Sequence, residues 1–247
     1  MSYPIYICFG VLPSIIWLLF YLRKDSHPES NRMILKIFLY GMLAALPAAL
    51  IEMGVLKEFN RLNLFSAQLN FFESGTNNFL FSILNIFIGV ALIEEFLKYL
   101  VVKGKVMNSP ELDEPIDIVL YMIISALGFA ASENILILFS LGSGFLFGTT
   151  LSISIFRFLG ATFLHALCSG TFGYFLALSF FETKKRGKFL MSGLGIATIL
   201  HGLYNFSIME MKGFWPVLTP ILILLGLAVF LAFAFQKLKK IKSVCKI

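Results

Sequence analysis

Long apolar segments alternate with short polar ones along the whole chain. A helix needs about 20 apolar residues to cross roughly 30 Å of hydrocarbon, because every backbone polar group must be satisfied within the segment. About seven segments meet this requirement, and most charges lie between them. The pattern therefore predicts transmembrane helices at residues 4–22, 33–56, 79–102, 116–141, 157–181, 189–209 and 215–236.

Two stretches between the predicted helices have a different pattern. Residues 142–156 are apolar but short, which indicates a re-entrant or interfacial lead into the fifth helix. The loop 57–78 mixes Leu and Phe with polar residues, a composition typical of a segment in the membrane interface. The other polar breaks are too short for a folded insert. We therefore expect an all-α, polytopic helix bundle in which residues 1–247 form a single integral membrane domain, with the catalytic helices in 79–209.

Composition agrees with a membrane protein. Of the 247 residues, 58% are hydrophobic and 14% are charged, and the mean hydropathy of +0.87 lies outside the usual range of soluble domains. The three cysteines are scattered at spacings that match neither a disulfide framework nor a CxxC metal site. The first helix has no basic region before it and no small-x-small cleavage site after it, so we expect a retained helix rather than a cleaved signal peptide.

Basic residues are divided unequally between the two sets of loops. If the amino terminus is outside, the outer segments hold only Lys57, Arg61 and Lys212. The inner segments hold a larger set: Arg23, Lys24, Arg32, Lys103, Lys105, Lys184, Lys185, Arg186, Lys188, Lys237, Lys239, Lys240, Lys242 and Lys246. The positive-inside rule then predicts a multi-pass protein of the cell membrane with its carboxyl terminus in the cytoplasm. Topology and contact with anionic headgroups explain the net charge of +6, which gives no reason to expect a nucleic-acid partner.

Polar side chains interrupt four of the predicted helices. A charge at mid-bilayer costs from about 2.5 to over 10 kcal/mol, so such groups face the bundle interior and pair with one another. Four helices that each carry an acid or an imidazole exceed what packing requires. These residues are Glu94, Glu95 and Lys98 in "ALIEEFLKYLVV", Glu133 and Asn134 in "GFAASENILIL", Arg157 and His165 in "RFLGATFLHALCSG", and His201 and Asn205 in "ILHGLYNFSI".

Helical spacing favours convergence of these groups. Lys98 follows Glu94 by four positions and Glu95 by three, so it shares a helix face with each. The two acids themselves diverge by about 100°, and we therefore expect that they do not aim at one atom. One should enter the site while the other pairs with Lys98 or Arg157. Small residues around Glu133 allow helix backbones to approach closely there.

Four motifs in these helices resemble those of a known family. "EEFLK" matches EExxK, "FAASEN" matches FxxxEN, "RFLGATFLHALCSGTFG" is similar to a third motif with Arg and His, and "HGLYN" resembles HxxxD or HxxxN. Together, over residues 94–205, they resemble the PrsW family of intramembrane proteases, related to the CAAX-processing and bacteriocin-immunity membrane proteases. The resemblance implies a membrane-embedded peptidase of metalloprotease or glutamate type. It also implies regulated proteolysis of a membrane protein substrate, as with the anti-sigma factor cut by the family's named example.

The candidate catalytic residues can activate water. A buried carboxylate takes a proton from water and returns it to the leaving amine, and two imidazoles can bind a metal or an oxyanion. A catalytic zinc has three protein ligands and a water, and Glu133, His165 and His201 supply that count, although chemistry without zinc uses the same residues. Among related enzymes the first Glu of the pair is the base, which favours Glu94. The catalytic candidates are Glu94, Glu95, Glu133, His165, His201 and Asn205, supported by Lys98, Asn134 and Arg157.

Two other classes of protein would also bury these residues. A proton- or metal-coupled transporter would do so, but we find no pair of Gly- or Pro-broken segments in corresponding halves. A non-catalytic membrane scaffold that keeps the fold is the second alternative. Individual acids could also have a structural role in place of a catalytic one. Glu94 and Glu95 could then form ion pairs with Lys98, and Glu133 could form one with Arg157.

Overall fold

The computed structural model describes residues 3–24, 27–68, 74–140 and 147–240, and within these ranges it has helices and no strand. The helical elements are α1 (Tyr3–Leu22), α2 (Asn31–Gln68), α3 (Ser74–Leu84), the π-helix η1 (Asn85–Leu92), α4 (Ile93–Lys105), α5 (Pro115–Ser140), α6 (Phe147–Leu159), α7 (Ala161–Phe181), the 3₁₀ turn η2 (Thr183–Lys185), α8 (Arg186–Met209) and α9 (Trp215–Leu238).

Seven stretches of the described helices are long and apolar enough to cross a membrane. They are 4–22, 31–62, 79–105, 115–140, 147–181, 183–209 and 215–238, and each contains or closely matches one predicted crossing. The prediction of an all-α, polytopic bundle is therefore confirmed. Large apolar side chains remain exposed on its outer faces, including Leu50 at 67% and Phe233 at 64%, as expected for surfaces that contact lipid.

Helices extend through two regions where sequence predicted other structure. The expected loop at 57–78 is wrong over its first part, because α2 continues to Gln68. Residues 57–68 contain no Gly or Pro and are rich in good helix formers, so nothing in them ends the helix. Residues 147–156, expected as part of a re-entrant or interfacial lead, begin α6. Residues 69–73 and 142–146 lie outside the described part of the chain.

A break at Gly160 separates α6 from α7. Gly160 has φ −105° and ψ −94°, outside the helical region, and α7 begins at the next residue. A break inside a membrane exposes backbone groups that need partners. One partner is Trp17 of α1, whose Nε1 donates to the carbonyl oxygen of Phe158 over 2.9 Å. The Trp17 ring also stacks on Phe163 of α7, with centroids 4.0 Å apart, so α1 holds both sides of the break.

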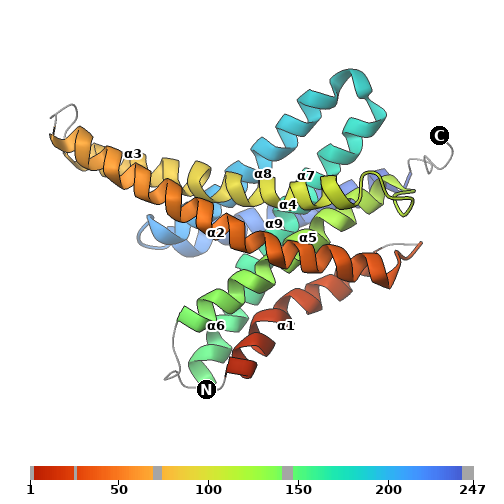
Figure 1. Ribbon diagram of the computed structural model, residues 1–247, viewed down its shortest axis with the longest axis horizontal. Helices are drawn as coiled ribbons and strands as arrows, with labels where there is room; N and C mark the ends of the chain where they lie inside the picture. The colour runs from red at the N-terminus through yellow and green to blue at the C-terminus, as the bar shows by residue number, and fades with distance from the viewer. Residues whose placement is uncertain (1–2, 25–26, 69–73, 141–146, 241–247) are drawn as a thin grey trace.

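Helix α5 lies at the centre of the bundle, and Figure 1 shows it crossing between α1, α2, α4 and α7. Nearly all of its residues from Pro115 to Ala131 are buried, unlike those of the outer helices. The described residues after α1 (23–24 and 27–30) and the turns at 106–114 and 182–185 lie towards the right and upper right of this view, whereas the start of α1 and the turn at 210–214 lie at the lower and left sides. Successive crossings thus alternate in direction.

Glycines allow α5 to contact α2 directly through the backbone. A Cβ added to Gly128 would lie 2.0 Å from the carbonyl oxygen of Phe38, and one added to Gly41 would lie 2.1 Å from that of Ser125. A real side-chain atom cannot occupy either position. The expectation that small residues near Glu133 allow close approach is confirmed at Gly128, and this contact fixes the depth at which α5 presents Glu133.

We expect Gly128→Ala to force α5 away from α2 and to lower the free energy of unfolding by about 1–3 kcal/mol, the usual cost of overpacking. Thermal unfolding of the detergent-purified protein measures the change. Gly54→Ala in α2 is the matched control, because nothing lies within 4 Å of its added Cβ. Equal stability of the two variants would contradict the proposed backbone contact.

Candidate active site

Four helices bring the predicted polar residues to one buried place. Glu94, Glu95 and Lys98 come from α4, Glu133 from α5, His165 from α7 and His201 from α8. Five of these residues expose between 0 and 4% of their surface: Glu94, Glu95, Lys98, His165 and His201. Charged groups buried this deeply inside a membrane bundle need partners, and their contacts show how each one is satisfied.

The π-helix η1 positions the acids of α4. It ends at Leu92, two residues before Glu94, and π-turns inside helices frequently occur at functional sites. Helix α8 approaches it at Gly202, where an added Cβ would lie 2.5 Å from the Phe87 ring. Because Gly202 follows His201, this close approach carries the His201 imidazole to within reach of Glu94 and Glu95.

Lys98 joins both acids to the α7 histidine. Its Nζ lies 3.1 Å from Glu94 Oε2, 2.8 Å from Glu95 Oε1 and 2.8 Å from His165 Nδ1. The expectation that Glu94 and Glu95 do not aim at one atom is therefore wrong. Lys98 lies about 40° around the helix from Glu94, between the directions of the two acids, and its long side chain brings the ammonium to both.

Each imidazole has a carboxylate on one nitrogen and faces Glu94 with the other. His165 Nε2 lies 2.8 Å from Glu133 Oε2, and its Nδ1 lies 3.6 Å from Glu94 Oε2. His201 Nδ1 lies 3.0 Å from Glu95 Oε1, and its Nε2 lies 3.9 Å from Glu94 Oε2. Since ionised carboxylates only accept hydrogen bonds, a neutral imidazole at either position donates its N–H to Glu133 or Glu95 and has its lone pair on the side of Glu94.

Arg157 and Asn134 support Glu133. Arg157 Nη2 lies 3.1 Å from Glu133 Oε2, and Arg157 Nε donates to Asn134 Oδ1. The Asn134 amide nitrogen in turn donates to the carbonyl oxygen of Gly10 and to Thr162 Oγ1, over 3.2 and 3.0 Å. These bonds join α1, α5, α6 and α7 around one acid. The expected pairing of Glu133 with Arg157 is present, together with the contact between Glu133 and His165.

Ser169 is a contact of the cluster that sequence reasoning did not select. Its hydroxyl donates to Glu95 Oε2 over 2.6 Å and is fully buried. Glu95 thus accepts bonds on both oxygens, from Ser169 on one and from Lys98 and His201 on the other. The signal was available, because Ser169 follows His165 by four positions and shares its helix face.

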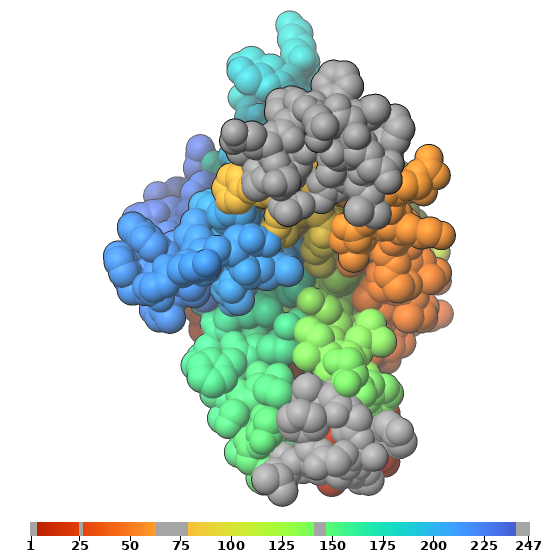
Figure 2. Space-filling model, turned by 90° about the vertical axis from the view of Figure 1, so that its left-hand side faces the viewer, coloured from red at the N-terminus to blue at the C-terminus, as the bar shows by residue number. Residues whose placement is uncertain are grey.

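A cavity of about 340 Å³ reaches the cluster from outside the bundle. Glu133, His165, His201 and Asn205 line it, and the amide of Asn205 has no hydrogen-bond partner among the described residues. Its mouth is apolar and exposed, with Phe156 at 75%, a value typical of lipid-facing side chains. Figure 2 shows the face where the end of α5, α6 and the turn from α8 to α9 come together.

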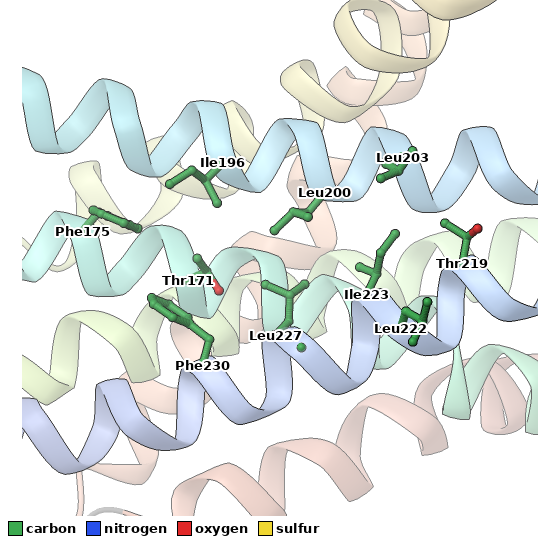
Figure 3. Close-up of a pocket in the computed structure, with 11 residues that line it drawn as sticks. Thr171, Phe175, Ile196, Leu200, Leu203, Thr219, Leu222, Ile223, Leu227 and Phe230 are labelled. Carbon is green, nitrogen blue, oxygen red and sulfur yellow. The ribbon is translucent and has the colours of Figure 1, made fainter.

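A larger cavity, of about 630 Å³, lies between α7, α8 and α9. Figure 3 shows apolar side chains such as Phe175, Leu200 and Leu227 around it, with two threonines. One of these, Thr171, donates its hydroxyl to the Leu167 carbonyl of its own helix. Among the described residues, those that line this cavity include no acid, base or imidazole, whereas the smaller cavity is lined by Glu133, His165 and His201.

Comparisons with known proteins agree with this geometry. A family model described as PrsW family intramembrane metalloprotease matches residues 29–235. The chain belongs to the PrsW family of intramembrane metalloproteases. Proteins named Protease PrsW are 29% identical in Oceanobacillus iheyensis (87% of this chain, 88% of that protein), 30% in Geobacillus kaustophilus (81% and 78%) and 27% in Bacillus subtilis (95% and 94%). No solved structure matches the chain.

Family membership decides between the classes that the sequence left open. A PrsW protein is a membrane peptidase, and the buried Glu and His cluster is compatible with that activity, whereas the transporter and scaffold alternatives are not favoured. The seven candidate spans make it a multi-pass membrane protein, and its family implies a membrane protein substrate in a lipid environment.

The metal implied by the family can be tested against the donor set. In the described residues, ligand atoms of Glu94, His165 and His201 lie within 4.8 Å of one another. In each histidine the ring nitrogen turned away from Glu94 contacts a carboxylate, the outer-shell arrangement that orients metal-binding imidazoles. One carboxylate and two imidazoles match the ligand set of several zinc peptidases. Glu94, His165 and His201 therefore fit a divalent metal. Glu133 is not in this group but contacts one of its members, His165.

The described residues contain another acidic group, formed by Glu29, Asp113 and Asp117 near the amino-terminal end of α5. Asp117 Oδ2 accepts the backbone N–H groups of Asp113 and Glu114 over 3.1 and 2.6 Å. This is the contact by which an acid in the first turn satisfies the N-terminal amides of its helix. The group lies apart from the cavity that Glu133, His165 and His201 line.

We expect Ser169→Ala to lower the free energy of unfolding by about 1–3 kcal/mol, because it leaves a buried carboxylate oxygen of Glu95 without a donor. Ser179→Ala is the control, since this buried α7 hydroxyl donates only to the Leu176 carbonyl. Thermal unfolding of both variants in detergent makes the measurement. The contact is unimportant if Ser169→Ala is no less stable than the control.

Proposed function

We propose that this PrsW family member hydrolyses a peptide bond of a membrane protein at the cluster of Glu94, Glu95, Glu133, His165 and His201. The observation that carries the proposal is the position of Glu94, whose Oε2 faces a nitrogen of both imidazoles while their other nitrogens are held by Glu133 and Glu95. Packing alone would not require this convergence of acids and imidazoles from four helices.

The geometry supports an exchange of the roles expected from sequence for Glu94 and Glu133. Glu94 is 4% exposed and adjoins both lone pairs, which suits a metal ligand. The side chain of Glu133 is 31% exposed and lines the cavity, which suits a group that meets water and substrate. We therefore assign Glu94, His165 and His201 as the residues that hold zinc, and Glu133 as the general base.

Zinc bound at these residues would polarise the scissile carbonyl and make its bound water acidic enough to lose a proton near neutral pH. Among the residues of the chain, Glu133 is the group that would accept a proton from an attacking water and return it to the leaving amine. Arg157 orients Glu133 through its ion pair. Asn205 lines the same cavity, and we assign its amide to donate a hydrogen bond to the developing oxyanion.

The cavity mouth favours a substrate that approaches from the bilayer. Phe156, Ile208 and Met209 line it and expose 75, 50 and 68% of their surface, so an apolar transmembrane segment can lie against them without crossing a polar surface. A single-pass membrane protein of the anti-sigma type, cleaved in a regulatory step, is the substrate class that we propose.

We expect Glu94→Gln and Glu133→Gln both to reduce turnover of a single-pass membrane substrate by at least about 100-fold, because the first removes a metal ligand and the second removes the acid-base group. Their metal contents should differ, because only Glu94→Gln removes a ligand. Elemental analysis of the purified variants therefore separates the two roles.

If Glu94→Gln keeps the metal and Glu133→Gln loses it, the metal ligands are Glu133, His165 and His201, as the sequence predicted. Wild-type turnover in both variants would refute hydrolysis at this cluster. Glu58→Gln in α2 serves as the control, because Glu58 is exposed, pairs with Arg61 at the surface and is distant in sequence from the cavity residues.

We also propose that the amino terminus is outside and that the cavity opens towards the outer surface. The basic residues of the 23–24, 103–105, 184–188 and 237–240 segments gather at one end of the bundle in Figure 1. The positive-inside rule assigns that end to the cytoplasm. The cavity mouth at Ile208 and Met209 belongs to the other end of α8.

In a background without native cysteines, we expect Met209→Cys to react with a membrane-impermeant maleimide in intact cells. Thr183→Cys, at the opposite end of α8, should react only after the membrane is made permeable. Gel-shift labelling measures both. The reverse pattern would show that the carboxyl terminus is outside.

A further inference from the structure

Lys98 donates hydrogen bonds to atoms that would be ligands in the candidate metal site. Its side chain is fully buried, and its three N–H donors meet three acceptors: Glu94 Oε2, Glu95 Oε1 and His165 Nδ1. The ammonium also lies 4.5 Å from the centre of the Phe129 ring. No donor of Lys98 is left over, so the residue is held firmly at the centre of the acids rather than at their edge.

Two of these three acceptors are also candidate metal ligands. Glu94 Oε2 and His165 Nδ1 lie 3.6 Å apart, and Glu94 Oε2 and His201 Nε2 lie 3.9 Å apart. Zinc bonds of about 2.0–2.2 Å place neighbouring ligand atoms at comparable separations. A metal at this position would therefore lie within contact distance of the ammonium that bonds to the same two atoms.

The conflict is sharpest at His165. Its Nε2 carries the hydrogen donated to Glu133, so Nδ1 is the nitrogen with the lone pair. An imidazole nitrogen has a single lone pair, and Lys98 uses it at 2.8 Å. Glu94 Oε2, by contrast, has two lone pairs and could contact both cations. His165 cannot accept from Lys98 and bind a metal through Nδ1 at the same time.

We propose that Lys98 is a competitor built into the metal site: a divalent ion binds Glu94, His165 and His201 only by displacing the Lys98 ammonium from His165 Nδ1. The inference rests on the metal ligands assigned under the proposed function. Lys98 thereby sets the affinity of the site, because every binding event must break its bond to the imidazole and bring a second positive charge beside it.

The Lys98 ammonium still has a binding partner after it leaves His165. Glu95 Oε1 is not among the candidate ligands and already binds Lys98 at 2.8 Å. Glu95 is held in turn by Ser169 and His201, so it keeps its position when Lys98 leaves His165. Glu95 is therefore a positioning residue that retains Lys98 in both arrangements.

The test compares metal binding by purified wild-type protein and by Lys98→Met, with Co²⁺ and Zn²⁺ as probes. The absorption bands of Co²⁺ report its coordination, and competition with Zn²⁺ gives both affinities without any substrate. We expect Lys98→Met to bind each ion about 10- to 100-fold more tightly than wild type, the range in which groups beside metal ligands change affinity.

Two controls separate competition from a general change of charge. Lys103→Met removes an equal charge from an exposed position in α4 and should bind Co²⁺ as wild type does. Adding His165→Ala to Lys98→Met should abolish the gain, because the released lone pair is then absent. Lys98→Gln, which keeps N–H donors without the charge, replaces Lys98→Met if the latter does not fold.

The proposal is overturned if neither Lys98 variant binds Co²⁺ more tightly than wild type, or if the gain survives His165→Ala. These results are independent of peptide cleavage. Loss of competition with normal turnover would remove this inference and leave the peptidase proposal intact. If Lys98 competes with the metal in a protein that does not cleave its substrate, this inference stands and the peptidase proposal fails.

Discussion

The neutralisation of charge inside an apolar bundle is the constraint on which the rest of this structure depends. Three carboxylates, one ammonium and one guanidinium lie among the five helices α4 to α8, and an unpaired member would be too costly to retain. The chain meets this constraint by connecting them: Lys98 joins Glu94, Glu95 and His165, and Arg157 joins Glu133 to Asn134. The helices can be arranged in few ways that keep these contacts, so the polar network also specifies the packing of α4, α5, α7 and α8.

Close backbone packing makes the network geometrically feasible. Side chains of Glu and His reach only a few ångströms beyond the helix surface, and glycines at the crossings bring the helices within that reach. Gly202 of α8 against Phe87 of η1 is such a crossing. A bundle with larger residues there would hold the same acids and imidazoles too far apart to share Lys98 or face one another.

The apolar pattern predicted the crossings and their order, because hydrocarbon thickness fixes helix length almost independently of tertiary context. It also predicted which polar residues converge, since the bilayer leaves buried charges little alternative. Helix ends were less predictable, as α2 shows by continuing to Gln68. The partners of individual acids were not predictable from spacing. Glu94 and Glu95 point in different directions around α4, yet the long side chain of Lys98 reaches both. The contact of Glu95 with Ser169 depends on the packing of α7 against α4.

The break at Gly160 divides one crossing into two parts with different tasks. Phe156, which lines the mouth, lies before the break, and His165, which faces Glu94, lies after it. Trp17 anchors both sides from α1, so a change in α6 need not be transmitted along a continuous helix to the imidazole. The mouth residues of α6 can consequently change in evolution without moving the imidazole of α7, provided that Arg157 keeps its contacts with Glu133 and Asn134.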